Sequence, residues 1–148
     1  MNELQKYFTN KKNGGYSDCT TDLKNKWWNG ATISNCVGFA WGMFNLDRGR
    51  RQNFRRMRGH AKDIFPACRK DGSGFLVGQT PKASSIACYD NGGKGHVVYI
   101  LWVWSTGYAV GLESNLPGPT ANKLLLRVKL GDPKKWYKGY QGCVYDYC

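Results

Sequence analysis

The chain has 148 residues, of which 41% are hydrophobic, and this length suits one domain with its own core. Its longest apolar stretch, residues 97–104, is far too short to span a membrane. The 22 Lys and Arg residues outnumber the 10 Asp and Glu residues and give a net charge of +12. Such a charge favours a polyanionic partner, which could be nucleic acid, anionic lipid or a bacterial wall rich in phosphate polymers.

Residues 1–30 contain turn-forming and aromatic residues without a helical or strand period, so we predict an irregular N-terminal segment. Met1 leads into polar residues with no apolar core of a secretory signal, which predicts a protein made in the cytoplasm. The reducing cytosol argues against disulfides among the six cysteines. We interpret Cys88 as a buried small hydrophobe, and Cys143 and Cys148 as terminal thiols rather than zinc ligands.

One helix is predicted after this segment, with Ser34 or Asn35 as its cap. Four apolar residues recur at helical spacing, namely Val37, Ala40, Trp41 and Phe44. Cys36 therefore lies at or just inside the N-terminus of the helix. A thiol at such a position beside a histidine can have a pKa of roughly 3.5–7.5, and the unpaired N–H groups can hold an oxyanion. The alternative is an inert, buried cysteine on an apolar helix.

Residues 48–58 form a basic run that also contains Phe54. Its six arginines are Arg48, Arg50, Arg51, Arg55, Arg56 and Arg58. Basic residues with an interleaved aromatic are typical of a nucleic-acid contact surface. One alternative function is therefore a small nucleic-acid-binding module, and the run could equally contact an anionic wall polymer.

The second half of the chain has the pattern of consecutive antiparallel strands. Four strands are predicted, at 84–90, 96–104, 108–114 and 123–130. Hairpin loops at 90–95 and 105–107 join the first three. A helix followed by a sheet predicts an α+β fold. We interpret residues 1–148 as a single domain, with 131–148 as a C-terminal tail.

A series of Cys36, His96, Glu113 and Asn115 stands in a chain with only two histidines. Such a series can build a thiolate nucleophile, its base and the group that orients the base. Strand residues alternate between the two faces of a sheet. A two-residue turn at Thr106–Gly107 would place Glu113 on the face of His96, whereas a three-residue loop would not. The alternative is a set of polar residues at strand ends that face water.

These residues give the chain a resemblance to the CHAP family, the cysteine, histidine-dependent amidohydrolases and peptidases with a papain-like core. The matching segments lie within roughly residues 30–130 and are Asn35-Cys36-Val37, Gly59 to Asp63, Ser85-Ile86-Ala87, Gly95-His96-Val97 and Glu113-Ser114-Asn115. The resemblance implies a cysteine-bearing helix packed on an antiparallel sheet. It implies Cys36 as nucleophile, His96 as base, Glu113 as third member and Asn115 as a supporting fourth. Asn35 stands where many members have Gln before the cysteine.

Members of the family cut peptidoglycan, and many are bacteriophage lysins. The resemblance therefore implies a wall hydrolase that is either an N-acetylmuramoyl-L-alanine amidase or an endopeptidase of the stem peptide or cross-bridge, and both stay open. Such an enzyme would act on the wall after release from the cell or as part of a virion. A non-catalytic wall-binding protein of the same fold is a further alternative.

The partners implied are peptidoglycan and anionic wall polymers, with nucleic acid and membrane insertion disfavoured. We predict no separate wall-binding domain, so the charge or a partner subunit would supply wall affinity. Trp27, Trp28 and Trp41 could line a substrate groove with Asn35 near the oxyanion, or the tryptophans could belong to the core. We predict no cofactor, and calcium is possible but not supported, because only Asp18 and Asp22 lie near the cysteine on its N-terminal side and they do not form the acidic calcium loop of some members.

Overall fold

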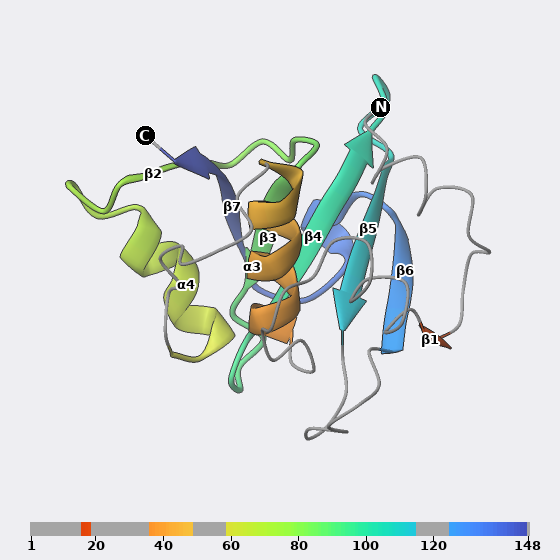
Figure 1. The fold of residues 1–148 in the computed structure, drawn as a ribbon, viewed down its shortest axis with the longest axis horizontal. Coiled ribbons are helices and arrows are strands. Elements are labelled where there is room, and N and C mark those ends of the chain that lie inside the picture. The colour runs from red at the N-terminus through yellow and green to blue at the C-terminus, as the bar shows by residue number, and fades with distance from the viewer. Residues whose placement is uncertain (1–15, 19–35, 49–58, 115–124, 148) are drawn as a thin grey trace.

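The computed structural model describes residues 16–18, 36–48, 59–114 and 125–147 (Figure 1). Within these ranges it contains helices α3 (Cys36–Asp47) and α4 (Ala61–Cys68), a 3-10 helix η1 (Pro133–Lys135) and one seven-stranded sheet. The strands are β1 (Tyr16–Asp18), β2 (Phe75–Gly78), β3 (Ser85–Tyr89), β4 (His96–Val103), β5 (Ala109–Ser114), β6 (Leu125–Gly131) and β7 (Tyr140–Tyr147). None of the helices in the described ranges is long and apolar enough to cross a membrane.

The strands lie in the order β1-β6-β5-β4-β3-β7-β2, and every neighbouring pair is antiparallel. The four predicted strands are confirmed as β3 to β6, and the predicted α+β class is confirmed. The prediction of a tail at 131–148 is wrong for residues 140–147, because they form β7 between β3 and β2. Helix α4 and strand β2 are further elements that the sequence did not predict.

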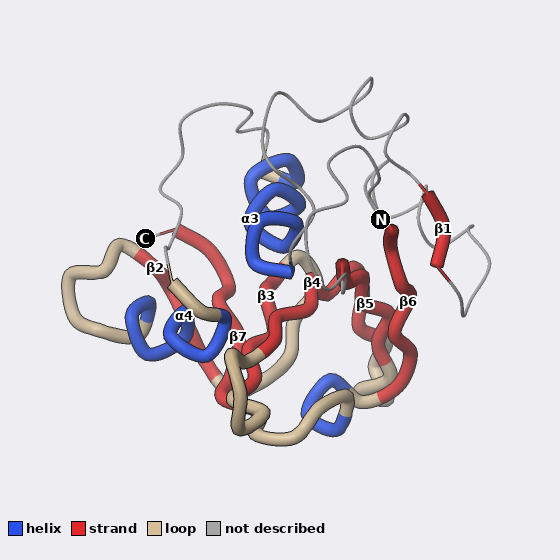
Figure 2. The backbone as a smooth tube through the Cα atoms, turned by 90° about the horizontal axis from the view of Figure 1, so that it is seen from below, coloured by secondary structure: helices blue, strands red, loops and turns tan. Residues whose placement is uncertain are grey.

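The two helices cover the same face of the sheet (Figure 2). Helix α3 lies over β3, β4 and β5, and its side chains Phe39, Trp41 and Phe44 are fully or almost fully buried. Its apolar residues pack with the inward side chains of the central strands in one core. Because this helix is buried on several sides, it is held by packing rather than by propensity, which its two glycines weaken.

The opposite face of the sheet is covered by the chain that follows β6. Trp136, Tyr137, Tyr140 and Tyr145 pack there against a second, smaller core. Gly111 on β5 leaves room for the Trp136 ring on this face, since a Cβ atom at position 111 would lie 2.7 Å from the ring. The C-terminal segment therefore forms a layer of the domain.

Helix α4 contains Pro66, which has no N–H to donate to the carbonyl one turn earlier. That carbonyl belongs to Lys62, and it accepts a hydrogen bond of 3.0 Å from the side-chain amide of Gln141 on β7. The start of α4 also lies against the loop before β4, where the Lys62 N–H donates to the Lys94 carbonyl at 3.1 Å. Gly95 is required at this contact, because a Cβ atom would lie 2.3 Å from the Lys62 nitrogen.

Candidate active site

Three elements bring their polar ends together at one end of the sheet (Figure 1). Cys36 is the first residue of α3 and His96 is the first residue of β4. Glu113 lies next to the end of β5, which runs antiparallel to β4. A buried helix and two central strands therefore position the thiol, the imidazole and the carboxylate.

His96 and Glu113 share one face of the hairpin, although the strands are not joined by the two-residue turn that would place them there directly. Trp104 pairs with Tyr108 through a 2.8 Å hydrogen bond, which leaves a loop of three residues rather than two. A bulge between Ile100 and Trp102 then shifts the register by one residue. The three-residue loop alone would put Glu113 on the face opposite to His96, and the bulge shifts the pairing by one residue. Glu113 and His96 therefore lie on the same face of the sheet.

The His96–Glu113 contact is short and buried. Nε2 of His96 lies 2.7 Å from Oε2 of Glu113, and the Glu113 side chain is 0% exposed. Burial raises the pKa of Glu113, but hydrogen bonds from His96 and Tyr137 outweigh this and hold the pKa below its ordinary value. Glu113 therefore stays ionised and accepts a hydrogen bond from the imidazole.

Cys36 faces the same ring from the helix. Its half-buried side chain is within hydrogen-bonding reach of His96. Because Nε2 is bonded to Glu113, the ring nitrogen left for the thiol is Nδ1. Burial lowers the pKa of His96, but hydrogen bonds and charge interactions with Cys36 and Glu113 outweigh this and raise the pKa to about 9. The ring is therefore mostly protonated at neutral pH, which suits an anionic group beside it.

Tyr137 completes the cluster, and the sequence analysis missed it. Its hydroxyl donates to Oε1 of Glu113 at 2.8 Å and to Oε2 at 2.6 Å. Its ring stands edge-on to the imidazole of His96, with centroids 4.7 Å apart. Tyr137 lies between η1 and β7, so the one available signal was the aromatic pair Trp136-Tyr137 in a segment interpreted as a tail.

The sequence model of the CHAP domain family matches residues 25–115, which is more than half of the 148-residue chain. The chain belongs to the CHAP domain family. The matched region includes Cys36, His96 and Glu113. Tyr137 lies outside it.

Two of the proteins to which the chain is similar show how far the likeness extends. A Streptococcus mutans serotype c (strain ATCC 700610 / UA159) protein, provisionally named a hydrolase, is 48% identical over 42 residues, which is 28% of this chain and 20% of that protein. The crystal structure of the wild-type endolysin LysIME-EF1 matches with a TM-score of 0.52 and 14% identity, covering 86% of this chain and 62% of that one. The chain thus spans about a fifth of the first protein and less than two thirds of the second. The structural likeness confirms the expected CHAP fold, with the cysteine-bearing helix on an antiparallel sheet.

The remaining candidates of this CHAP domain divide into two groups. Trp41 is 1% exposed within the core, which agrees with the second of its two interpretations, a core residue rather than part of a substrate groove. Cys143 is a free cysteine, but it is buried in β7 and does not lie on a tail, and Cys88 is a buried core residue as predicted. Outside the described residues, or with side chains outside them, lie Asn35, Asn115, Trp27, Trp28, Asp18, Asp22, Cys148 and five arginines of the basic run.

Arg48 is the one arginine of the basic run that the structure describes, and it is bound within the fold. Its guanidinium donates to the carbonyls of Phe44, Ser84 and Tyr145 and pairs with Asp146 at 2.8 Å. A guanidinium with these partners is not available to a nucleic-acid phosphate.

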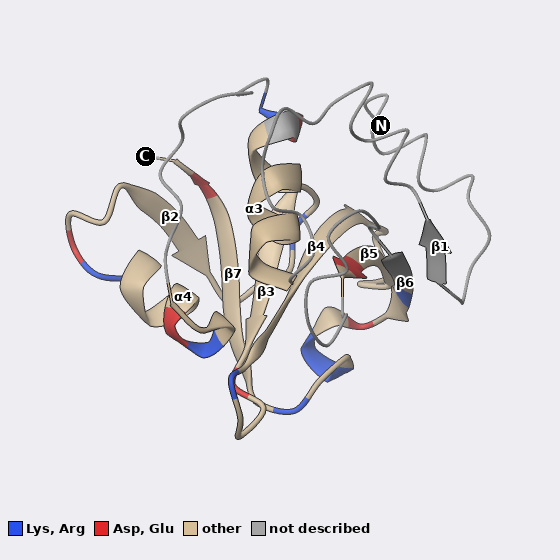
Figure 3. Ribbon diagram, turned by 60° about the horizontal axis from the view of Figure 1, so that its bottom comes forward, with Lys and Arg blue, Asp and Glu red and all other residues tan. Residues whose placement is uncertain are grey.

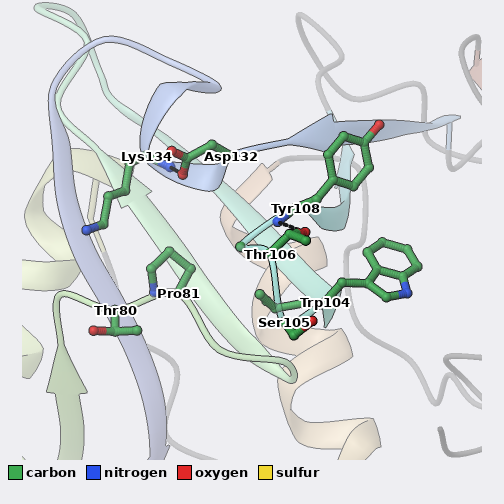
Figure 4. A pocket seen from close by; sticks show the side chains of 10 residues that line it. Thr80, Pro81, Trp104, Ser105, Thr106, Tyr108, Asp132 and Lys134 are labelled. Atoms are coloured by element: carbon green, nitrogen blue, oxygen red, sulfur yellow. Dashed lines mark hydrogen bonds between the residues drawn. The ribbon is translucent and has the colours of Figure 1, made fainter.

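No group of three or more His, Cys, Asp or Glu side chains in the described ranges is placed to hold a metal ion. A hollow of about 620 Å³ lies at the other end of β4 (Figure 4). Pro81, Lys134 and the hairpin loop around Thr106 line it, while the rings of Trp104 and Tyr108 point away from Lys134. Its lining contains no thiol, imidazole or glutamate, so it is separate from the Cys36–His96 site.

Proposed function

We propose that this chain is a peptidoglycan hydrolase that cleaves an amide bond of the stem peptide or cross-bridge through a Cys36 thiolate. The observation that carries the proposal is the buried His96–Glu113 pair at 2.7 Å, whose imidazole also interacts with Cys36. Membership of the CHAP domain family and the likeness to an endolysin structure support peptidoglycan as the substrate.

The proposed reaction has two steps. The thiolate of Cys36 attacks the amide carbonyl carbon, and the N–H groups at the start of α3 stabilise the oxyanion. His96 gives its proton to the leaving amine, the C–N bond breaks and a thioester remains. Water then loses a proton to His96 and attacks the thioester, which releases the product as a carboxylic acid that ionises in solvent and regenerates the Cys36 thiolate beside the protonated His96. Glu113 keeps the ring in the orientation that faces Cys36 throughout.

Asn115 is proposed to support the site, either beside His96 or at the oxyanion. The wall is also the source of the polyanion that the net charge of +12 favours. Lys94, Lys134, Lys135 and Lys138 are exposed, and Figure 3 shows basic residues on the first turn of α4 and around η1. We propose that such residues draw the protein to anionic wall polymers, with action on the wall after release.

The test is the loss of turbidity of purified Gram-positive cell walls. His96→Ala and Cys36→Ser are expected to abolish the loss, whereas His60→Ala is the matched control. His60 is the other histidine; it is exposed and makes no side-chain capping bond at the start of α4. Unchanged lysis in Cys36→Ser would overturn the thiolate mechanism.

Fragment masses from the same digests identify the bond. An amidase releases whole stem peptides with a free N-terminus, whereas an endopeptidase leaves part of each peptide on the sugar. Intact walls from several species, together with salt-dependent binding to duplex DNA, would instead favour the nucleic-acid-binding alternative.

A further inference from the structure

Tyr137 makes contacts that the proposed reaction does not use. Its hydroxyl lies 2.8 Å and 2.6 Å from the two carboxylate oxygens of Glu113, and its ring is edge-on to His96 at an interplanar angle of 68°. It therefore touches two of the three groups of the site from the side opposite α3. Neither its residue type nor its position marks it in the sequence.

The contacts fit the ionised form of Glu113 best. Oε2 of Glu113 lies within hydrogen-bonding distance of both His96 and the Tyr137 hydroxyl. An ionised carboxylate accepts both bonds, whereas a carboxyl group protonated at Oε2 would point its own proton at a donor. Glu113 is fully buried, and a buried charge is costly unless donors stabilise it. The Tyr137 hydroxyl is such a donor.

Tyr137 is itself held in place by its surroundings. Nζ of Lys129 on β6 lies 4.7 Å from the centroid of its ring. Tyr89 packs edge-on against it at 5.5 Å and donates its own hydroxyl to the Pro133 carbonyl at 2.5 Å. A donor fixed by packing on several sides can orient its acceptor with little loss of entropy on bonding.

We propose that Tyr137 is a positioning residue that acts through Glu113, keeping the carboxylate ionised and aimed at His96 so that the imidazole faces Cys36. The proposal rests on the thiol chemistry proposed above. It extends the site beyond the region matched to the CHAP domain, into the segment between η1 and β7. It also predicts that the hydroxyl matters most at low pH, where Glu113 is closest to taking up a proton.

The test uses the reactivity of Cys36 toward iodoacetamide, measured across pH by the mass of the peptide that contains it. This readout requires no wall substrate, so it can succeed or fail independently of lysis. Tyr137→Phe keeps the ring on His96 and removes the hydroxyl. Tyr145→Phe is the matched control, because it removes a hydroxyl that donates to the Thr80 carbonyl at 2.6 Å, away from the Cys36–His96 site.

The acid limb of the Cys36 alkylation profile is expected to move up by about one pH unit in Tyr137→Phe, since one charge-assisted hydrogen bond to Glu113 is lost. The control should keep the wild-type profile. Identical alkylation profiles for Tyr137→Phe and Tyr145→Phe would overturn the proposal. They would show that loss of the Tyr137 hydroxyl has no more effect on the pH dependence of Cys36 than loss of a hydroxyl away from the site.

A double-mutant cycle with Glu113→Gln decides whether Tyr137 acts through Glu113. With the carboxylate already removed, adding Tyr137→Phe is expected to change Cys36 alkylation by less than about twofold. Losses that multiply in the double variant would show an independent role and overturn the proposal. If wild-type walls stay intact while the predicted alkylation pattern is observed, the positioning role stands and the wall-hydrolase function fails.

Discussion

The two ends of helix α3 are both tied to the sheet by polar side chains, and they differ in what those side chains can do. At the first end, His96 interacts with Cys36 and Glu113, and its pKa of about 9 lets the ring lose its charge within the accessible pH range. At the last end, Arg48 donates to three carbonyls, and Asp47 accepts a 2.5 Å bond from Tyr99. An arginine stays charged at all accessible pH values, so its end is a fixed anchor.

The difference indicates a division of labour along one helix of 12 residues. The Arg48 guanidinium holds the last turn of α3 against β7 and the loop before β3. Because the helix is rigid, its first turn is thereby held beside His96. Substitutions at the first end should change chemistry more than stability, and substitutions at the last end should do the reverse. The predictions below test this contrast, from the largest expected effect to the smallest.

Glu113→Gln should reduce wall lysis by about 10²- to 10⁴-fold, since an amide cannot stabilise the imidazolium or accept two donors at one carboxylate oxygen as Glu113 does. The rate of turbidity loss measures this, and far-UV circular dichroism checks that the fold is kept. Lysis within tenfold of wild type would contradict the role assigned to the buried carboxylate.

Arg48→Ala should lower the free energy of unfolding by about 3 kcal/mol, since it leaves buried carbonyls without their charged donor. The Arg48 side chain is 14% exposed, and its guanidinium also lies 3.6 Å from the centroid of the Phe44 ring. Urea denaturation measures the loss. Lysis per folded molecule should stay near that of wild type.

Arg69→Ala is the matched control for Arg48→Ala. Arg69 is exposed beyond the end of α4, and its guanidinium lies 5.9 Å from the Phe65 ring centroid. Its loss should cost no more than about 0.5 kcal/mol. Equal destabilisation by both substitutions would remove the distinction between an anchoring and a surface arginine.

Stability should fall with rising pH because of His96. Its pKa is raised from 6.5 to about 9 in the fold, so its stabilising contribution is complete below pH 6.5 and is lost as pH rises through about 9. The loss should amount to at most about 3 kcal/mol. Urea denaturation of the wild type and of His96→Gln over this pH range measures the contribution of His96. The free energy of unfolding of the variant should depend less on pH than that of the wild type. Parallel curves would contradict the raised pKa.

The sequence predicted the elements whose pattern is local. Helix α3 and strands β3 to β6 follow from apolar spacing and hairpin loops. Alternation along strands also placed Glu113 beside His96, but by a different route from the observed one. The observed hairpin has the three-residue loop 105–107, which alone would put Glu113 on the face opposite to His96. A bulge near Leu101 shifts the register by one residue and returns Glu113 to the face of His96. A bulge of this kind has no marker in the residues themselves.

Strand β7 and Tyr137 could not be predicted, since their partners are far away in the chain. Ile86 pairs with Val144, and Tyr137 binds a carboxylate of another strand. Gly142 looks like a strand breaker in sequence. In the fold it is required, because a Cβ atom there would lie 2.6 Å from the ring of Phe65 on α4. Gly142 therefore both weakens the strand pattern of β7 in the sequence and allows α4 to pack on that strand.

Asp146→Asn should have a much smaller effect than Arg48→Ala, although it removes the ion pair with Arg48. The Asp146 side chain is 55% exposed, and exposed pairs contribute about 0–1 kcal/mol because water and salt screen them. Urea denaturation in low and high salt should show a loss under about 1 kcal/mol that shrinks further with salt. A loss as large as that of Arg48→Ala would place the anchoring energy in the ion pair. The expected small loss places it in the carbonyls to which Arg48 donates, since those contacts are partly buried and the arginine stays charged at all accessible pH values.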